Sequence, residues 1–152
     1  MARSPPQGTR IPGPMMIPCR ERLLLSHLSA LSPARLDSLA RDRGPAVVQE
    51  ALARFEVLVV EEGRGLVRAL EAGGGPEACR RAFLLEGAAL EIGGQRLARC
   101  CRLLIERPAA GDAAALVTEM LTETLAATAQ VRRRYAPAEL PDAVAAPVEP
   151  VS

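Results

Sequence analysis

The sequence predicts an all-α fold, an antiparallel four-helix bundle with extra helical structure at its N-terminal side. The prolines inside the chain each precede a stretch rich in Ala, Leu, Glu and Arg, as expected where proline opens a helix. Apolar residues within these stretches recur at spacings of three and four, which is the helical pattern. Aromatic residues make up only 2% of the chain, which argues against a β-sandwich.

The distribution of proline also divides the chain into a domain and two tails. Of the 13 prolines, nine lie outside residues 19–136. The two ends, residues 1–18 and 136–152, are predicted to be disordered tails, because they cannot bury enough apolar surface to offset the entropy of ordering. Residues 19–135 are then predicted to form one helical-bundle domain.

The N-terminal helical structure is predicted as two short helices. The first covers residues 19–31, with these leucines on one side: Leu23, Leu24, Leu28 and Leu31. The second covers residues 33–41, where Ser32 before Pro33 suits the N-cap position.

Four longer helices follow. The longest is predicted over residues 45–72, and we expect Gly63 and Gly65 to bend or interrupt it. Its apolar stripe is Val48, Leu52, Phe55, Val59, Leu66 and Leu70. The remaining three are predicted over residues 76–92, 95–107 and 110–135, the first of them closed by Gly93-Gly94.

Charge and composition exclude several classes of function. The formal net charge of +1 predicts no nucleic-acid partner, and no segment is apolar for long enough to span a membrane. A single histidine, His27, makes a histidine-based metal site or catalytic triad improbable, so we expect no metal, no cofactor and no enzymatic activity. The cysteines have no CxxC spacing and are interpreted as reduced thiols of a cytoplasmic protein: Cys19, Cys79, Cys100 and Cys101.

The helix over residues 76–92 carries the most informative pattern. One stripe that should face the core consists of Ala78, Ala82, Leu85, Ala89 and Ile92. At about 100° per residue, Phe83 then lies roughly 140° from the centre of that stripe and points outward. A glycine inside a helix often permits close approach by another chain, and Gly87 lies one turn after Phe83.

This helix resembles the phosphohistidine helix of histidine phosphotransfer (HPt) domains. Residues 82–93 read A-F-L-L-E-G-A-A-L-E-I-G and are followed by Gln95, Arg96 and Leu97. The family pattern is roughly A-H-x-L-K-G-x-x-x-x-[LI]-G, followed shortly by R-L. A weaker resemblance extends over residues 31–134 and includes the helix that opens at Gly44-Pro45.

The sequence departs from the family at the residues that carry its chemistry. Phe83 stands at the position of the phosphoaccepting histidine, and Glu86 at that of the phosphate-supporting lysine. A phenyl ring has no nucleophilic nitrogen, and a carboxylate at position 86 would repel a phosphate. Ala88 stands where the family commonly has a small polar residue. The resemblance therefore implies a scaffold that has kept its shape without a catalytic residue.

The function that the resemblance implies is a pseudo-phosphotransfer protein of a two-component phosphorelay. HPt domains dock a receiver domain of a response regulator on this helix, so a receiver or a sensor kinase is the expected partner. The expected contact residues are Cys79, Phe83, Glu86, Gly87 and Leu90. Phe83 would be the apolar anchor of such an interface.

Two alternatives remain open at this point. The predicted first helix, residues 19–31, could cover Phe83, since a small domain gains by hiding an outward aromatic ring. The chain could also be a structural or oligomeric helical bundle unrelated to signalling, with self-association through the Phe83 face, because an Ala-rich, Arg-rich composition alone produces much of the pattern.

Overall fold

The computed structural model describes residues 16–107 and 110–136, and these ranges contain helices but no strand. In chain order the helices are α1 (Cys19–His27), α2 (Pro33–Arg43), α3 (Pro45–Glu71), α4 (Pro76–Glu91), α5 (Gln95–Glu106) and α6 (Ala113–Arg134). The prediction of an all-α fold is confirmed for this part of the chain. None of these helices is both long and apolar enough to cross a membrane.

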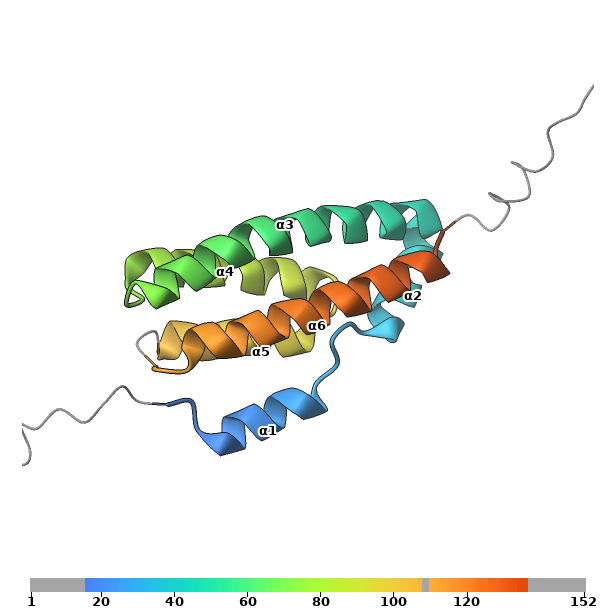
Figure 1. The fold of residues 1–152 in the computed structure, drawn as a ribbon. Helices are drawn as coiled ribbons and strands as arrows, with labels where there is room; N and C mark the ends of the chain where they lie inside the picture. Colours follow the sequence, from blue (N-terminus) through green and yellow to red (C-terminus); the bar gives the residue numbers. More distant parts are fainter. Residues whose placement is uncertain (1–15, 108–109, 137–152) are drawn as a thin grey trace, which may run out of the picture.

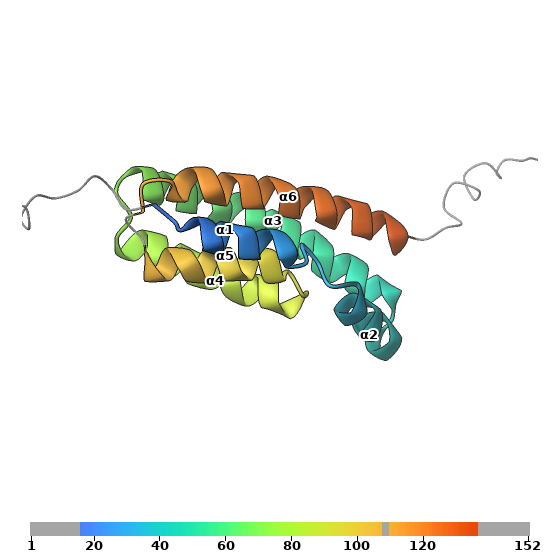
Figure 2. The ribbon, with the colours of Figure 1, turned by 90° about the horizontal axis from the view of Figure 1, so that it is seen from below.

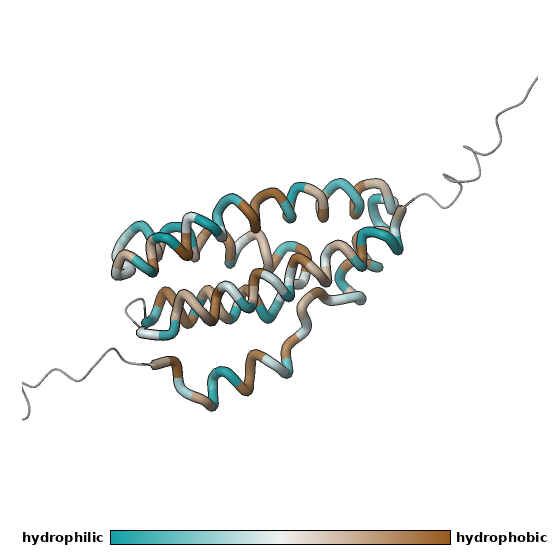
Figure 3. The backbone as a smooth tube through the Cα atoms, viewed as in Figure 1, coloured by the Kyte–Doolittle hydropathy of each residue, from teal (hydrophilic) through white to brown (hydrophobic). Residues whose placement is uncertain are grey.

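The four helices α3 to α6 pack around a shared apolar core. Helices α3 and α5 each contact both α4 and α6, and consecutive helices run in opposite directions (Figure 1). Apolar and polar segments alternate along each helix, so that one side of each can be buried (Figure 3). The largest fully buried side chains of these four helices are Leu52, Leu66, Leu85, Leu97, Leu103 and Leu104.

Proline and serine begin the helices where the sequence predicts. Pro33, Pro45 and Pro76 are the first residues of α2, α3 and α4, where their missing N–H groups have no intrahelical partner. The Ser32 hydroxyl accepts a hydrogen bond from the Arg35 backbone N–H at 3.2 Å, so the predicted N-cap is confirmed. Pro108 lies outside the described residues.

The first helix is shorter than predicted. It ends at His27 because Leu28 has extended backbone, with φ −92° and ψ 152°. The predicted leucine face is also wrong in part, since Leu23 and Leu24 are exposed and Leu25 is buried instead. Leu31 is buried as well, but from the connection to α2 rather than from a helix.

Helix α1 is attached to α5 and to the start of α6, whereas α2 packs on α3 (Figure 2). The Asp112 carboxylate accepts hydrogen bonds from the Ile17 backbone N–H at 3.0 Å and from the Arg22 guanidinium at 2.9 Å. Ile17 is itself buried, although the sequence assigns it to the front tail. Residues 1–15 and 137–152 of the two predicted tails lie outside the described residues.

Helix α3 runs without interruption from Pro45 to Glu71, so the expected interruption at Gly63 and Gly65 is wrong. Both glycines instead make room for side chains of neighbouring helices. A Cβ atom at Gly63 would lie 2.8 Å from a δ-carbon of Leu121 on α6. A Cβ atom at Gly65 would lie 2.4 Å from the guanidinium carbon of Arg81 on α4. The missing side chains thus allow both helices to pack closely on α3.

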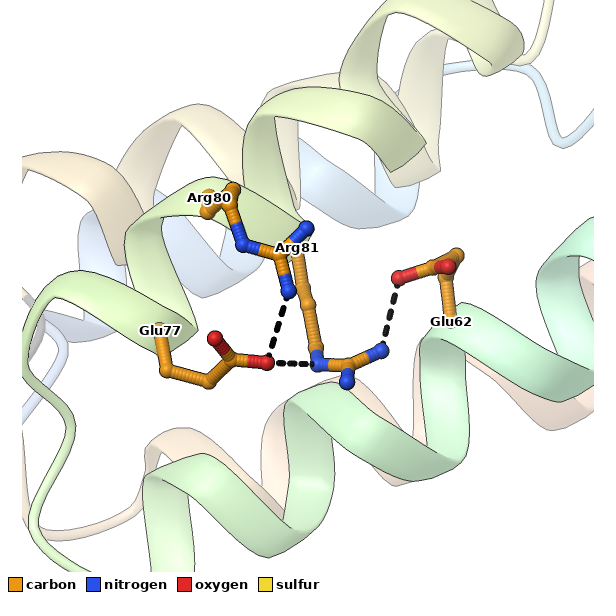
Figure 4. A network of polar contacts seen from close by, with 4 residues as sticks. All are labelled: Glu62, Glu77, Arg80 and Arg81. Carbon is orange, nitrogen blue, oxygen red and sulfur yellow. Dashed lines mark hydrogen bonds and ion pairs between the residues drawn. The ribbon is translucent and has the colours of Figure 1, made fainter.

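Arg81 uses this space to join α4 to α3. Its guanidinium donates to Glu62 on α3 at 2.8 Å and to Glu77 on its own helix at 2.6 Å (Figure 4). Arg80 donates to the same Glu77 carboxylate at 2.8 Å. Hydrogen bonds from Arg80 and then Arg81 lower the pKa of Glu77, so its carboxylate stays charged and the network persists in mildly acidic solution.

The cysteines differ in reactivity because they differ in burial. Cys100 and Cys101 are buried on α5, and burial raises the pKa of the Cys100 thiol to about 12. Cys19 is exposed and Cys79 is half-buried. At pH 8 we therefore expect a thiol reagent such as DTNB to modify Cys19 first and to leave Cys100 and Cys101 unmodified until the protein unfolds.

Burial of Cys100 also makes the free energy of unfolding decrease at alkaline pH. The folded state favours the neutral Cys100 thiol, so its contribution is fully present below the ordinary pKa of 9.0 and is lost as the pH rises toward about 12. Rapid modification of all four thiols in the native protein at pH 8 would contradict this assignment.

Candidate functional site

The surface stripe of α4 that the sequence predicts is present on the described structure. Phe83 and Leu90 are each 55% exposed, and Gly87 is exposed between them. No heavy atom of another part of the chain lies within 4 Å of the position that a Gly87 Cβ would take. Leu84, which the sequence analysis did not assign to this surface, adds a further large exposed apolar side chain. We call Phe83, Leu84, Gly87 and Leu90 the α4 face.

The stripe follows from the burial of the opposite side of α4. Ala78, Ala82, Leu85 and Ala89 are buried, as the spacing predicts, and Ile92 is buried just after the helix ends. Three of these four helical positions are alanine, so α4 approaches its neighbours closely along that side. Apart from Leu85, the larger apolar residues of the helix lie on the surface: Phe83, Leu84 and Leu90.

The alternative in which the predicted first helix covers Phe83 is wrong. Helix α1 packs on α5 and makes no contact with α4. It lies there because Asp112 and the arginines of α5 hold it, with Arg99 pairing with Glu21 at 3.2 Å and Arg96 donating to the Leu28 carbonyl at 3.0 Å. The sequence also assigns Cys79 to the outer stripe, but this residue is half-buried and not fully exposed.

Glu86 is not an isolated carboxylate, because it is paired with an arginine of α5. Arg102 on α5 donates two hydrogen bonds to it, from Nε at 3.1 Å and from a terminal nitrogen at 2.8 Å. The Glu86 side chain is only 14% exposed, so its charge is compensated inside the α4–α5 contact. The net repulsion of a phosphate at this position is correspondingly weaker than the isolated carboxylate suggests.

Arg102 is a residue of the candidate site that the pattern of α4 alone does not reveal. Its guanidinium carbon lies 5.3 Å from the centre of the Phe83 ring, which is within the range of a cation–π contact. The sequence does contain a signal for the contact between Arg102 and Glu86, which is their spacing from the turn between α4 and α5. Glu86 and Arg102 lie at nearly equal distances along the chain from Gly93 and Gly94, and antiparallel helices place such residues opposite each other.

The arrangement can bind but offers little for catalysis. Phe83, Leu84 and Leu90 present an apolar surface, and Arg102 places a cation, already paired with Glu86, at its edge. No side chain of the α4 face is a nucleophile or a general base. The described residues hold no group of three His, Cys, Asp or Glu side chains placed to bind a metal ion.

A double-mutant cycle should measure how firmly Arg102 and Glu86 hold each other. We expect Arg102→Ala to lower the free energy of unfolding by about 1–2 kcal/mol, because it leaves a mostly buried carboxylate unpaired. With Glu86→Ala, the coupling energy from urea denaturation should be about 1 kcal/mol, since Arg102 is 37% exposed and solvent screens the pair. A coupling near zero would mean that the two charges are independent.

Comparison of this chain with family models, with curated proteins and with solved structures finds no match.

Proposed function

We propose that this chain is a pseudo-histidine-phosphotransfer protein, which binds a response-regulator receiver domain, or a sensor kinase, in a two-component phosphorelay of the cytoplasm. In this interpretation, α3 to α6 are the antiparallel four-helix bundle of an HPt-like domain, and α1 and α2 are the extra N-terminal structure. The observation that carries the proposal is the α4 face, where Phe83 and Leu90 are exposed on both sides of the open Gly87.

Exposed apolar side chains clustered on one helix favour a protein partner. Apolar surface is unfavourable in water until a partner buries it. Aromatic residues are also common at the centres of interfaces. Gly87 would let the backbone of α4 approach the partner, because nothing projects from it. The ion pair of Glu86 and Arg102 would lie at the rim and orient the partner.

In this proposal the protein does not accept a phosphoryl group, because Phe83 stands at the acceptor position. Phosphoryl transfer needs a nucleophile at the acceptor position, and a phenyl ring provides none. The single histidine, His27, is on α1, which packs on α5 rather than on α4. The chain would therefore compete with an active HPt protein for its receiver, or sequester that receiver.

Gly87→Leu tests the proposal without damaging the fold. Leucine is a better helix former than glycine, Gly87 is exposed, and a Cβ atom at this position has no neighbour within 4 Å, so we expect the free energy of unfolding to stay the same or rise by up to about 1 kcal/mol. Affinity for the cognate receiver, measured by calorimetry across the response regulators of the same cell, should fall at least tenfold.

Two results would contradict the proposal. The first is receiver binding that is unchanged by Gly87→Leu. The second is acid-labile phosphate on the wild-type chain after incubation with a phosphorylated receiver.

The exposed area of the α4 face also supports a second candidate, a structural or oligomeric helical bundle. Leu84 widens the apolar surface beyond the residues expected to contact a receiver, and a second copy of the chain could cover it. Sedimentation equilibrium separates the two functions. A dimer that Gly87→Leu dissociates, with no receiver bound by either form, would favour the oligomeric bundle.

A further inference from the structure

The groove between α3 and α6 has a different chemical character from the α4 face. It has a volume of about 380 Å³, and its apolar lining includes Val60, Val67, Leu121 and Leu125. These four side chains are half-buried, so water still reaches them. Figures 1 and 2 place α3 and α6 on one side of the molecule and α4 and α5 on the other. The groove is therefore separate from the surface proposed to bind a receiver.

The charged residues of the groove are all cations, and they come from α3. Arg64 and Arg68 line it one helical turn apart. Both are exposed, and neither forms an ion pair with any of the described residues. Most arginines of α3 to α6 have a carboxylate partner, so this pair provides positive charge with which no carboxylate of residues 16–107 and 110–136 forms an ion pair.

The wall that α6 contributes offers no charge and no spare hydrogen-bond donor. The Thr118 hydroxyl donates to the Ala114 carbonyl at 2.8 Å, and the Thr122 hydroxyl donates to the Thr118 carbonyl at 3.0 Å. The acidic residues of α6 lie elsewhere. Glu123 pairs with Arg96 of α5 at 2.7 Å, and Glu119 lines a separate hollow beside α1.

The cations are also distributed unevenly along the groove. Arg64 and Arg68 occupy its middle and one end, whereas the other end is formed by Val59, Val60 and Leu125. The α3 side from Val59 to Val67 is about 12 Å long, at 1.5 Å per helical residue. A ligand that matches this pattern has an anionic head at the Arg68 end and an unbranched apolar body toward Val59.

We propose that the α3–α6 groove binds a medium-chain fatty carboxylate. Its carboxylate would accept charge-assisted hydrogen bonds from Arg64 and Arg68, and its acyl chain would cover the half-buried aliphatic side chains. Charge complementarity selects an anion over a neutral or cationic amphiphile. A protein helix fits the site less well, because a groove of about two turns is shorter than a stable helix-in-groove interface requires.

Calorimetric titration of the full chain with dodecanoate, below the concentration at which it forms micelles, tests the proposal. We expect one dodecanoate per chain. We expect no binding of dodecyltrimethylammonium, whose alkyl chain has the same number of carbon atoms but whose head group is positively charged. Affinity should rise by about two- to fourfold for each methylene added between octanoate and dodecanoate, because each one buries apolar surface. It should then level off in hexadecanoate, whose chain is longer than the groove.

Paired arginine variants assign the binding to the groove. Arg64→Gln with Arg68→Gln should weaken dodecanoate binding about tenfold or more, since the charged hydrogen-bond donors are lost. Arg41→Gln with Arg43→Gln makes the same change of net charge on exposed arginines of α2 and should have no effect. Thr122→Phe changes no charge but places a ring over the groove, and it should also weaken binding.

Several outcomes would overturn the proposal. They are no saturable dodecanoate binding, equal loss in both arginine pairs, equal binding of the cationic amphiphile, or binding of an acidic amphipathic peptide in place of dodecanoate. None of them bears on the receiver proposal, because that proposal depends on α4 and is measured with a different partner.

Discussion

Replacing Gly93 by alanine should lower the free energy of unfolding by about 3 kcal/mol, because two costs act at one residue. Gly93 has φ +78°, in the left-handed region, where a Cβ atom costs about 1–2 kcal/mol. That atom would also lie 2.6 Å from Cβ of Ser32 and 3.2 Å from the Ser32 backbone nitrogen. Backbone cannot move aside as a flexible side chain can, so the whole contact must shift.

The contact that would shift is the one that joins the N-terminal helices to the α4–α5 turn. Arg35 donates from Nε to the Glu91 carbonyl at 3.0 Å, and the Arg96 backbone N–H donates to the Ser29 carbonyl at 3.0 Å. Ser32 is in addition the N-cap of α2. Displacing the chain at Ser32 would therefore loosen the cap and the two hydrogen bonds together.

Gly73→Ala is the matched control for this prediction. Gly73 also has a left-handed backbone, with φ +110°, but no atom lies within 4 Å of its missing Cβ. Its substitution should cost about 1–2 kcal/mol, from backbone strain alone. Urea denaturation of both variants measures the difference. Equal losses for the two glycines would show that the contact with Ser32 carries no energy.

The order of the helices could be predicted from the sequence because local signals determine it. Prolines open α2, α3 and α4, glycines follow α3 and α4, and the apolar spacing identifies which side of α4 is buried. These signals act within a few residues, so they can be recognised without knowledge of the fold. The outward position of Phe83 follows from the same periodicity.

The contacts between helices could not be predicted in the same way. Gly63 and Gly65 are helix-breaking signals locally, but α3 is continuous through them, and Leu121 and Arg81 occupy the space that their side chains would fill. Helix α1 ends at His27, and just beyond it the Ser29 carbonyl accepts a hydrogen bond from the backbone N–H of Arg96 on α5, a residue far from it in sequence. Tertiary contacts override local propensity at such positions.

The electrostatics of the candidate site were predicted least well. Glu86 was assigned from α4 alone, whereas its environment is set by Arg102, 16 residues later on α5. The same arginine lies over the Phe83 ring, so two of the departures from the HPt pattern, Phe83 and Glu86, contact one cation. A charge on a helix surface can be interpreted only with the neighbouring helix in place.

Phe83→Ala should separate the proposed interface from the fold more clearly than any other substitution. If the α4 face docks a receiver, loss of the ring should weaken binding by about 30-fold, which corresponds to the 2 kcal/mol typical of a hot-spot residue. The free energy of unfolding should fall by about 1 kcal/mol or less, because the ring is 55% exposed and loses mainly its contact with Arg102.

Val57→Ala provides the control, because Val57 is an apolar residue of similar exposure on α3 and should not affect the receiver. A calorimetric titration beside a thermal melt distinguishes the outcomes for Phe83→Ala. Weakened binding with an unchanged melt supports docking on α4. A loss of about 3 kcal/mol in stability would instead mean that the ring supports the fold, as truncation of a core aromatic residue does. Unchanged binding and an unchanged melt would remove Phe83 from the interface, and the receiver would then have to bind elsewhere on the molecule.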